Sequence, residues 1–405
     1  MTRISRRNLL SGMVSAPFIL RAGPSRSADK PFQIGAVLPK TGLASQYGDF
    51  AAAGLNVGVD QVNAKGGILG RQVQLIVRDD ATNPGRALLA AKELVSEQKV
   101  DLLYPGIISG TTMAALPFTT AQKVITISNG ASPQIGDVAK FPYSFQLADL
   151  VTKRIPPLAA AIKKLGGTKV GILVRTNPPQ VALGDGLADE LPRLYGLPVV
   201  GYKQHSGDAK DLTPQLQSLR EAGADIIAFS TVAREGVRVV MVGMQTLGWK
   251  AKVVGEPAAL YGDLTEQVPS AVHDQFFAIN YKMGAQLKNS PPAREQMIAD
   301  LRKLGPIQNL GISCVARDAI HLFAWACATA SAQTGGIGPE TLKNALESVG
   351  TVALPPDVSL VLGNPNFSAA THTTANVNYQ DIWSLVRVSR PVDGAYEGEA
   401  LTLLS

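Results

Sequence analysis

Cysteine is nearly absent from this chain of 405 residues, which contains only Cys314 and Cys327. Both lie in the apolar run from Ser313 to Ser331, which the spacing of its apolar residues predicts to be one helix. At a rise of about 1.5 Å per residue, the two cysteines would stand roughly 20 Å apart. A disulfide needs α-carbons closer than about 7 Å, so we expect two free, mostly buried thiols.

Catalytic and metal-binding motifs are also missing. The four histidines, none of them at a spacing typical of metal ligands, are His205, His273, His321 and His372. The sequence has no Gly-x-Ser-x-Gly, no Walker loop and no strand-to-helix Gly-x-Gly-x-x-Gly. Ser206 beside His205 is no catalytic pair, because neighbours on an extended segment point apart. We therefore predict a binding protein without metal or cofactor, and not an enzyme.

The net positive charge is small once the first residues are set aside. Residues 1–28 contain five arginines and no acid, so the formal charge falls from +6 for the whole chain to +1 without them. No basic stripe with interleaved aromatic residues remains. This composition excludes nucleic acid as an expected partner.

The first residues have the order of an export signal. The pair Arg6-Arg7 precedes an apolar run from Leu9 to Leu20, and small residues follow. The start resembles a twin-arginine signal, with the general secretory route as the alternative. The run is too short to anchor the protein, and no later run approaches the roughly 20 apolar residues of a membrane span. We expect residues 1–28 to be removed, leaving a soluble, monomeric periplasmic protein.

Length and periodicity predict two α/β lobes. A chain this long exceeds the usual single core. Apolar strands alternate with amphipathic helices from Phe32 to Ser128, and the alternation pauses near Tyr143 to Asp149 before it resumes. This order is typical of doubly wound parallel sheets, here two lobes joined by a three-strand hinge. The expected division is residues 29–148 and 282–356 for lobe one, and 149–281 and 357–405 for lobe two.

The segment from Val62 to Pro84 joins a helix end, a strand and a second helix start. A lysine and two glycines follow Asn63, which is the chemistry of a helix carboxyl end. A β-branched run then predicts a strand that delivers Asp79 and Asp80 to its carboxyl end. These carboxylates either cap the loop and the next helix, or contact a ligand or metal.

This segment resembles the substrate-binding receptors of branched-chain amino acid ABC importers, the leucine/isoleucine/valine-binding protein family. The family motif N-x-x-GG-I-x-G-…-DD-x-x-(D/N)-P stands here as Asn63, Gly66, Gly67, Ile68, Gly70, Asp79, Asp80, Asn83 and Pro84. The resemblance extends from about Phe32 to about Arg387. It implies the type I periplasmic binding fold, a small-molecule ligand, closure of two lobes about a hinge, and an ABC permease as partner.

The candidate residues of lobe one lie in loops that follow strands, where ligands of open α/β sheets gather. Ser109, Gly110 and Thr111 open a helix, so their unpaired backbone N–H groups and hydroxyls suit a carboxylate. Helix capping by Ser109 or Thr111 is compatible with this role. The resemblance implies that the Gly130 backbone and the Ser132 hydroxyl also hold the carboxylate.

The resemblance further implies that Tyr47 lies over the side chain of the ligand, with a tyrosine packed beneath its own loop as the alternative. In lobe two, Leu183 and Val232 stand where the family has the aromatic residues that hold an ammonium group. Glu256 lies within one residue of the family acid. An ammonium without these partners would be poorly compensated, because an unpaired buried charge costs several kcal/mol.

Three arginines of the second half complete the set of candidates. Arg175 and Arg234 lie at predicted strand ends facing the expected cleft, and Arg317 lies where the family helix begins. Each is either a surface residue or a contact to an anion. With Leu183 and Val232 they indicate a cleft for an anion with an apolar body.

We therefore predict a receptor that closes on a small carboxylated solute, aromatic, aliphatic or amino-acid-like, and delivers it to an ABC importer. The alternatives are a receptor for branched-chain amino acids proper and a ligand-sensing regulatory protein of the same fold.

Overall fold

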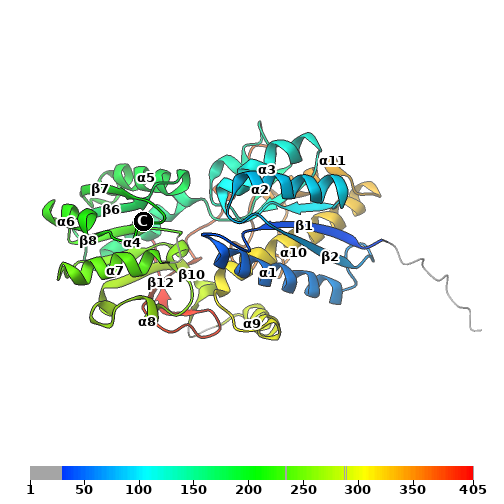
Figure 1. The fold of residues 1–405 in the computed structure, drawn as a ribbon. Coiled ribbons are helices and arrows are strands. Elements are labelled where there is room, and N and C mark those ends of the chain that lie inside the picture. Colours follow the sequence, from blue (N-terminus) through cyan, green and yellow to red (C-terminus); the bar gives the residue numbers. More distant parts are fainter. Residues whose placement is uncertain (1–29, 233–234, 287, 289, 405) are drawn as a thin grey trace, which may run out of the picture. The chain divides into compact units, whose positions relative to one another are not determined.

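The structure is a computed structural model that describes residues 30–232, 235–286, 288 and 290–404. The predicted signal at residues 1–28 lies outside the described residues. The first sheet has five parallel strands in the order β2-β1-β3-β4-β5. Figure 1 labels β1 and β2 of this sheet. Their bounds are β1 (Phe32–Leu38), β2 (Val73–Asp79), β3 (Leu102–Tyr104), β4 (Thr126–Ser128) and β5 (Ser144–Gln146).

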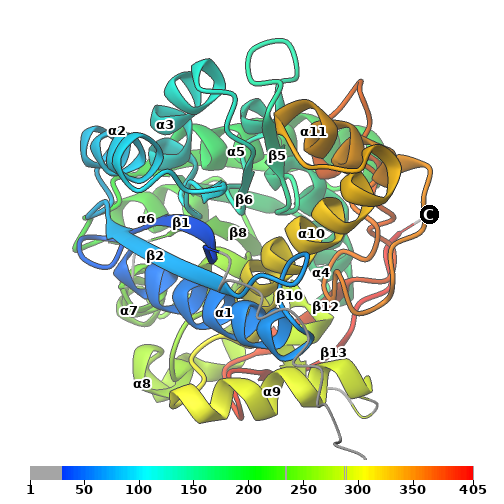
Figure 2. The same cartoon turned by 90° about the vertical axis from the view of Figure 1, so that its right-hand side faces the viewer.

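Alternation along β1 sends side chains to both faces of this sheet. Ile34 and Ala36 pack with α1 and α10, whereas Val37 packs with α2 and α3. Figure 2 shows α1 and α10 together, with α2 and α3 beyond the strands. The helices that accompany this sheet are α1 (Ser45–Ala64), α2 (Pro84–Lys92), which a π-helical turn (Glu93–Glu97) continues, α3 (Ser109–Ala121), α9 (Pro292–Leu304), α10 (Leu310–Thr334) and α11 (Pro339–Glu347).

The second sheet has eight strands in the order β11-β13-β12-β10-β9-β8-β6-β7. It is parallel from β7 to β10, and β12 then pairs antiparallel with both β10 and β13. The strands are β6 (Val170–Arg175), β7 (Val199–His205), β8 (Ile226–Ser230), β9 (Lys252–Gly255), β10 (Phe276–Tyr281), β11 (Ala285–Gln286), β12 (Trp383–Arg387) and β13 (Tyr396–Ala400). The doubly wound α/β prediction is confirmed, with an antiparallel addition at one edge.

Helices cover both faces of the second sheet as well. Ile172 packs with α4 and α5, and its neighbour Leu173 packs with α6 and α7. The helices are α4 (Ile155–Lys164), α5 (Pro178–Tyr195), α6 (Thr213–Glu221), α7 (Gly236–Thr246) and the short α8 (Leu264–Gln267). Each sheet therefore carries its own core, as expected for two lobes.

Two of the predicted crossings between the lobes lie elsewhere. β11 pairs with β13 in the second sheet, so the chain leaves that sheet after Gln286 and not at residue 281. The segment after residue 356 stays with the first sheet, because the Phe367 ring lies 5.3 Å from that of Phe145 and Gln146 N donates to His372 O at 2.8 Å. The double proline begins a loop that covers β5, and the chain reaches the second sheet only at β12.

α10 is the central helix of the first lobe, and it confirms the cysteine prediction. Cys314 and Cys327 are both buried and free. A Cβ added at Gly54 of α1 would lie 2.0 Å from the Ser313 carbonyl oxygen, so glycine permits the close approach of α1 to α10.

By length and composition, α10 could cross a membrane, whereas we expected that no run after the first residues would be long and apolar enough. Because 89% of that window is buried in the protein, α10 is a core helix.

Candidate functional site

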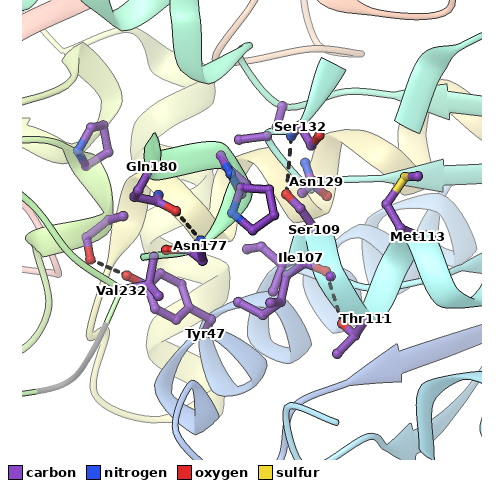
Figure 3. A pocket seen from close by; sticks show the side chains of 18 of the residues that line it. Tyr47, Ile107, Ser109, Thr111, Met113, Asn129, Ser132, Asn177, Gln180 and Val232 are labelled. Carbon is purple, nitrogen blue, oxygen red and sulfur yellow. Dashed lines mark hydrogen bonds between the residues drawn. The ribbon is translucent and has the colours of Figure 1, made fainter. Parts of the chain in front are cut away.

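A cavity of about 430 Å³ lies at the carboxyl ends of strands from both sheets. The loops that follow parallel strands lie together at this edge of the sheet, so side chains that are distant in the sequence meet there. Figure 3 shows residues from both lobes that line this cavity. The lining includes seven of the candidate residues, which are Tyr47, Ser109, Gly110, Thr111, Ser132, Arg175 and Val232.

The first wall is the start of α3. The N–H groups of Ser109, Gly110 and Thr111 have no hydrogen-bond partner among the described residues, and the helix bonds begin with Thr112 N donating to Ile108 O at 3.0 Å. Three N–H groups and the positive end of the helix dipole therefore lie at the cavity. Such an end binds carboxylates and other anions.

The hydroxyls beside this helix start are not equivalent. Ser109 Oγ accepts from Ser132 N at 3.2 Å, which leaves the Ser109 proton available for a ligand (Figure 3). Ser132 Oγ makes only a long contact of 3.5 Å with Gln134 Oε1. Thr111 Oγ1 donates to Ile108 O at 3.0 Å, so its proton is already used. The donors therefore gather at Ser109 and Ser132.

Gly130 supports this wall from behind and is not part of the cavity lining. Its carbonyl oxygen accepts from Gln146 Nε2 at 2.8 Å. A Cβ at Gly130 would lie 2.5 Å from Ile135 Cδ1 and 3.3 Å from Ser109 Cα. The residue lets the two loops approach one another, and the structure does not place it as the ligand contact that we predicted.

Tyr47 reaches from α1 to the other lobe. Its side chain is 5% exposed, packs at an edge-on angle against Phe50, and its hydroxyl donates to the Ala258 carbonyl oxygen. Burial and the Glu256 carboxylate raise the pKa of the Tyr47 hydroxyl, which therefore remains a donor. Tyr47 lines the cavity and contacts both lobes at once.

The prediction for Leu183 was wrong. The helix α5 begins at Pro178, because two prolines fit its first turn. Leu183 consequently lies within the helix, 1% exposed, in the core of the second lobe. The residues of this region that line the cavity are Asn177 to Gln180, and Val232 lines it as well. Arg234 lies outside the described residues.

Glu256 is buried beside the cavity and is not among the residues that line it. Its carboxylate accepts from Arg154 Nη1, from Ser230 Oγ and, at 3.3 Å, from Gln180 Nε2. Arg154 in turn donates Nε and Nη2 to Asp149 at 2.6 and 2.9 Å. Burial lowers the pKa of Arg154, but Asp149 and Glu256 together raise it further, so the net shift is upward. Glu256 is thus the partner of an arginine.

The two remaining arginine predictions have opposite outcomes. Arg175, at the end of β6, lines the cavity, and burial lowers the pKa of its guanidinium. Arg317 is 4% exposed, donates to Gln61 Oε1 at 2.9 Å and to Asp357 O at 2.6 Å, and does not line the cavity. Arg317 therefore connects α10 to α1 and to the loop that contains Asp357.

Asp79 and Asp80, the two carboxylates of the family motif, accept hydrogen bonds from the backbone of nearby loops. Asp79 accepts from the backbone N–H groups of Lys40, Thr41 and Ala81 at 2.8 to 3.1 Å. Asp80 accepts from Thr82 N at 2.7 Å. Neither aspartate lines the cavity. Within the described residues, no group of three or more His, Cys, Asp and Glu could hold a metal ion.

Several polar residues of the wall were not predicted. Asn129 donates to Val315 O at 3.3 Å, and its side-chain oxygen is buried without a partner in the described part of the chain. The Asn177 side-chain oxygen is likewise buried and has no hydrogen-bond partner among the described residues. Both asparagines directly follow strand ends or precede a helix, and that position is the signal that could have identified them.

Comparisons with known proteins agree with this architecture. A protein-family model described as periplasmic binding protein matches residues 31–387. The Leu/Ile/Val-binding protein homolog 7 of Brucella abortus is 25% identical over 228 residues, which are 54% of this chain and 56% of that relative. The chain therefore aligns with little more than half the length of this curated relative.

Solved structures extend the likeness over nearly the whole chain. A solute-binding protein of an ABC transporter from Rhodopseudomonas palustris, in complex with p-hydroxybenzoic acid, is 19% identical with a TM-score of 0.74, and the match covers 93% of this chain and 97% of that one. A branched-chain amino acid transporter substrate-binding protein from Streptococcus pneumoniae, in complex with isoleucine, is 18% identical with a TM-score of 0.73, and the match covers 92% and 100%. At these identities the likeness shows a shared fold.

Proposed function

We propose, from the premise that this chain belongs to the periplasmic binding proteins of the branched-chain amino acid type, that it is an extracytoplasmic receptor for a small carboxylated solute. On this proposal it is exported to the periplasm as a monomer, closes on its solute and delivers it to an ABC importer. Proteins of this family are typically transport components without catalytic activity.

The single observation that carries the ligand class is the start of α3. Three unpaired N–H groups at Ser109, Gly110 and Thr111 open into the cavity, with the Ser109 and Ser132 hydroxyls beside them. A carboxylate at this position would accept several charge-assisted hydrogen bonds, which are about twice as strong as neutral ones. The helix dipole adds a further favourable contribution of about 0.3–1 kcal/mol.

The opposite wall supports a ligand without an α-amino group. An ammonium group needs an anionic partner, and the two buried carboxylates of this region, Asp149 and Glu256, are already bound by Arg154. Glu256 also accepts from Ser230 and Gln180, so a ligand cation would have to displace existing donors. The remaining wall offers apolar atoms of Val232, Ile312 and Val315.

The way the chain connects the lobes supports closure. The polypeptide passes between the two lobes three times, after β5, after β11 and before β12, which permits rotation about these connections without disruption of either core. Tyr47 of α1 and Ala258 beyond β9 belong to different lobes and contact each other at the cavity. A ligand that touches both lobes stabilises this closed arrangement by its differential affinity for it.

A receptor for branched-chain amino acids is the second candidate. It is favoured by the names of the relatives and by a similar structure solved with isoleucine. The buried carboxylate of Glu256 also favours it, because its partner Gln180 lines the cavity. In that case a ligand ammonium would take the place of Gln180, whose contact of 3.3 Å is the longest that Glu256 makes.

Replacing Ser132 by alanine tests the carboxylate site. A thermal-shift screen over aliphatic and aromatic acids first identifies the acid that raises the melting temperature most, because a ligand specific to the folded state stabilises it. The affinity of S132A for that acid, measured by calorimetry, is expected to fall by ~10–100-fold, the usual scale for a hydrogen bond to a charged group. The control is S270A, which removes an exposed hydroxyl of the second lobe. Unchanged affinity in S132A would contradict the assignment.

A further inference from the structure

Arg175 is a cavity-lining cation without a protein partner. Its guanidinium forms no ion pair or hydrogen bond with any residue that the structure describes. Asp208 attracts it only through space, and the Asp208 carboxylate accepts from Ser206 Oγ. The guanidinium rests on Gly207, where an added Cβ would lie 2.3 Å from Arg175 Nε. The glycine thus leaves space for the arginine at the wall.

A second arginine that lines the cavity, Arg154, has its charge compensated by carboxylates of the protein. Arg154 is held by two carboxylates at its Nε, Nη1 and Nη2 atoms. Arg175 is half-buried and has no such pair, although removal of a cation from water is costly unless an anion accompanies it. The downward shift of the Arg175 pKa that burial causes is consistent with a missing partner.

Two groups that can bind anions at the cavity belong to different lobes. The α3 start lies in the first lobe and Arg175 in the second, and the apolar residues that line the same cavity include Ile107, Ile312 and Val315. A planar guanidinium fork matches a carboxylate through two parallel hydrogen bonds. We propose that the solute is a dicarboxylate with an apolar middle, whose first carboxylate lies at the α3 start and whose second pairs with Arg175. This inference rests on the carboxylate receptor proposed above.

Matched pairs of acids test the proposal on the wild-type protein. Calorimetric titrations compare adipate with hexanoate, and terephthalate with 4-methylbenzoate, so that each pair differs by one carboxylate. We expect the dicarboxylate of at least one pair to bind ~10–100-fold more tightly, as for a hydrogen-bonded charge pair. If both monocarboxylates bind as tightly as their partners or more so, the dicarboxylate proposal is wrong while the carboxylate receptor stands. If no acid binds, both proposals fail.

Substitution of Arg175 assigns the preference to this residue. In R175Q the ratio of the two affinities is expected to fall to about one, and R175K, which keeps the charge but not the fork, is expected to give an intermediate ratio. The matched control is R238Q, which removes an exposed arginine of α7 in the same lobe, away from the cavity, and should keep the ratio. A preference that survives in R175Q, or one that disappears equally in R238Q, would overturn the assignment.

Discussion

Replacing Arg154 by methionine is expected to lower the free energy of unfolding by about 3–5 kcal/mol. Arg154 is 6% exposed and is the cation between the buried carboxylates of Asp149 and Glu256. Without it two negative charges would remain in the interior, and the side-chain donors left to them among the described residues would be the neutral groups of Tyr281, Ser230 and Gln180. Urea denaturation followed by circular dichroism gives the free energy of unfolding in each variant.

A second substitution separates the charge effect from lost packing. The double variant R154M/E256Q removes one of the uncompensated carboxylates and is expected to recover part of the lost stability. The control R238M changes an exposed arginine and should alter the free energy of unfolding by less than about 0.5 kcal/mol. A loss below about 1 kcal/mol in R154M would show that the network does not depend on this cation.

Replacing Gly110 by aspartate is expected to weaken binding of the carboxylate ligand by at least ~100-fold, because like charges in direct contact cost several kcal/mol. Gly110, the second residue of α3, lines the cavity, and a Cβ added there would have no neighbouring atom within 4 Å. An acid in the first turn also interacts favourably with the helix dipole. The melting temperature of the unliganded protein should therefore not fall, while calorimetry should show the loss of binding.

The variant G110N is the matched control for size. Asparagine has the volume of aspartate without its charge, so G110N should bind the acid more tightly than G110D does. Equal affinity in the two variants would mean that the α3 start blocks the ligand by bulk and does not act as an anion site.

Local pattern was sufficient for the start of α3 and for Ser132 in the first lobe, although not for Gly130. A strand, a short loop and a helix start determine where backbone N–H groups are left unpaired, so Ser109, Gly110 and Ser132 could be predicted to line the cavity. Tyr47 was predicted as well, although its contact with the other lobe was not.

The second lobe was harder because its site depends on long-range pairs and on one helix boundary. Arg154 and Glu256 are 102 residues apart, and no local signal indicates that they form an ion pair. Leu183 was misplaced because the two prolines were not recognised as the first turn of α5, which shifts every later residue of that helix relative to the cavity. Arg317 was misplaced because its partner Gln61 lies on a helix of a different segment of the chain.

The prediction that the chain crosses to the second lobe after residue 356 was wrong for a similar reason. A double proline does mark the end of a helical region, but the following loop can cover either lobe, and contacts of Phe367 and His372 with Phe145 decide the outcome. Such contacts join residues that are more than two hundred positions apart in the sequence, so periodicity cannot reveal them.

Calorimetric titration with leucine and with 4-methylpentanoate tests the central claim most directly, because the two compounds share a carbon skeleton and a carboxylate and differ in the α-amino group. The α3 site serves both ligands, so any discrimination reports on the opposite wall, where Glu256 is already paired with Arg154. We predict that 4-methylpentanoate binds at least ~10-fold more tightly than leucine, since leucine alone must bury an uncompensated ammonium group. Tighter binding of leucine would contradict the account and identify the ordinary branched-chain amino acid ligand instead.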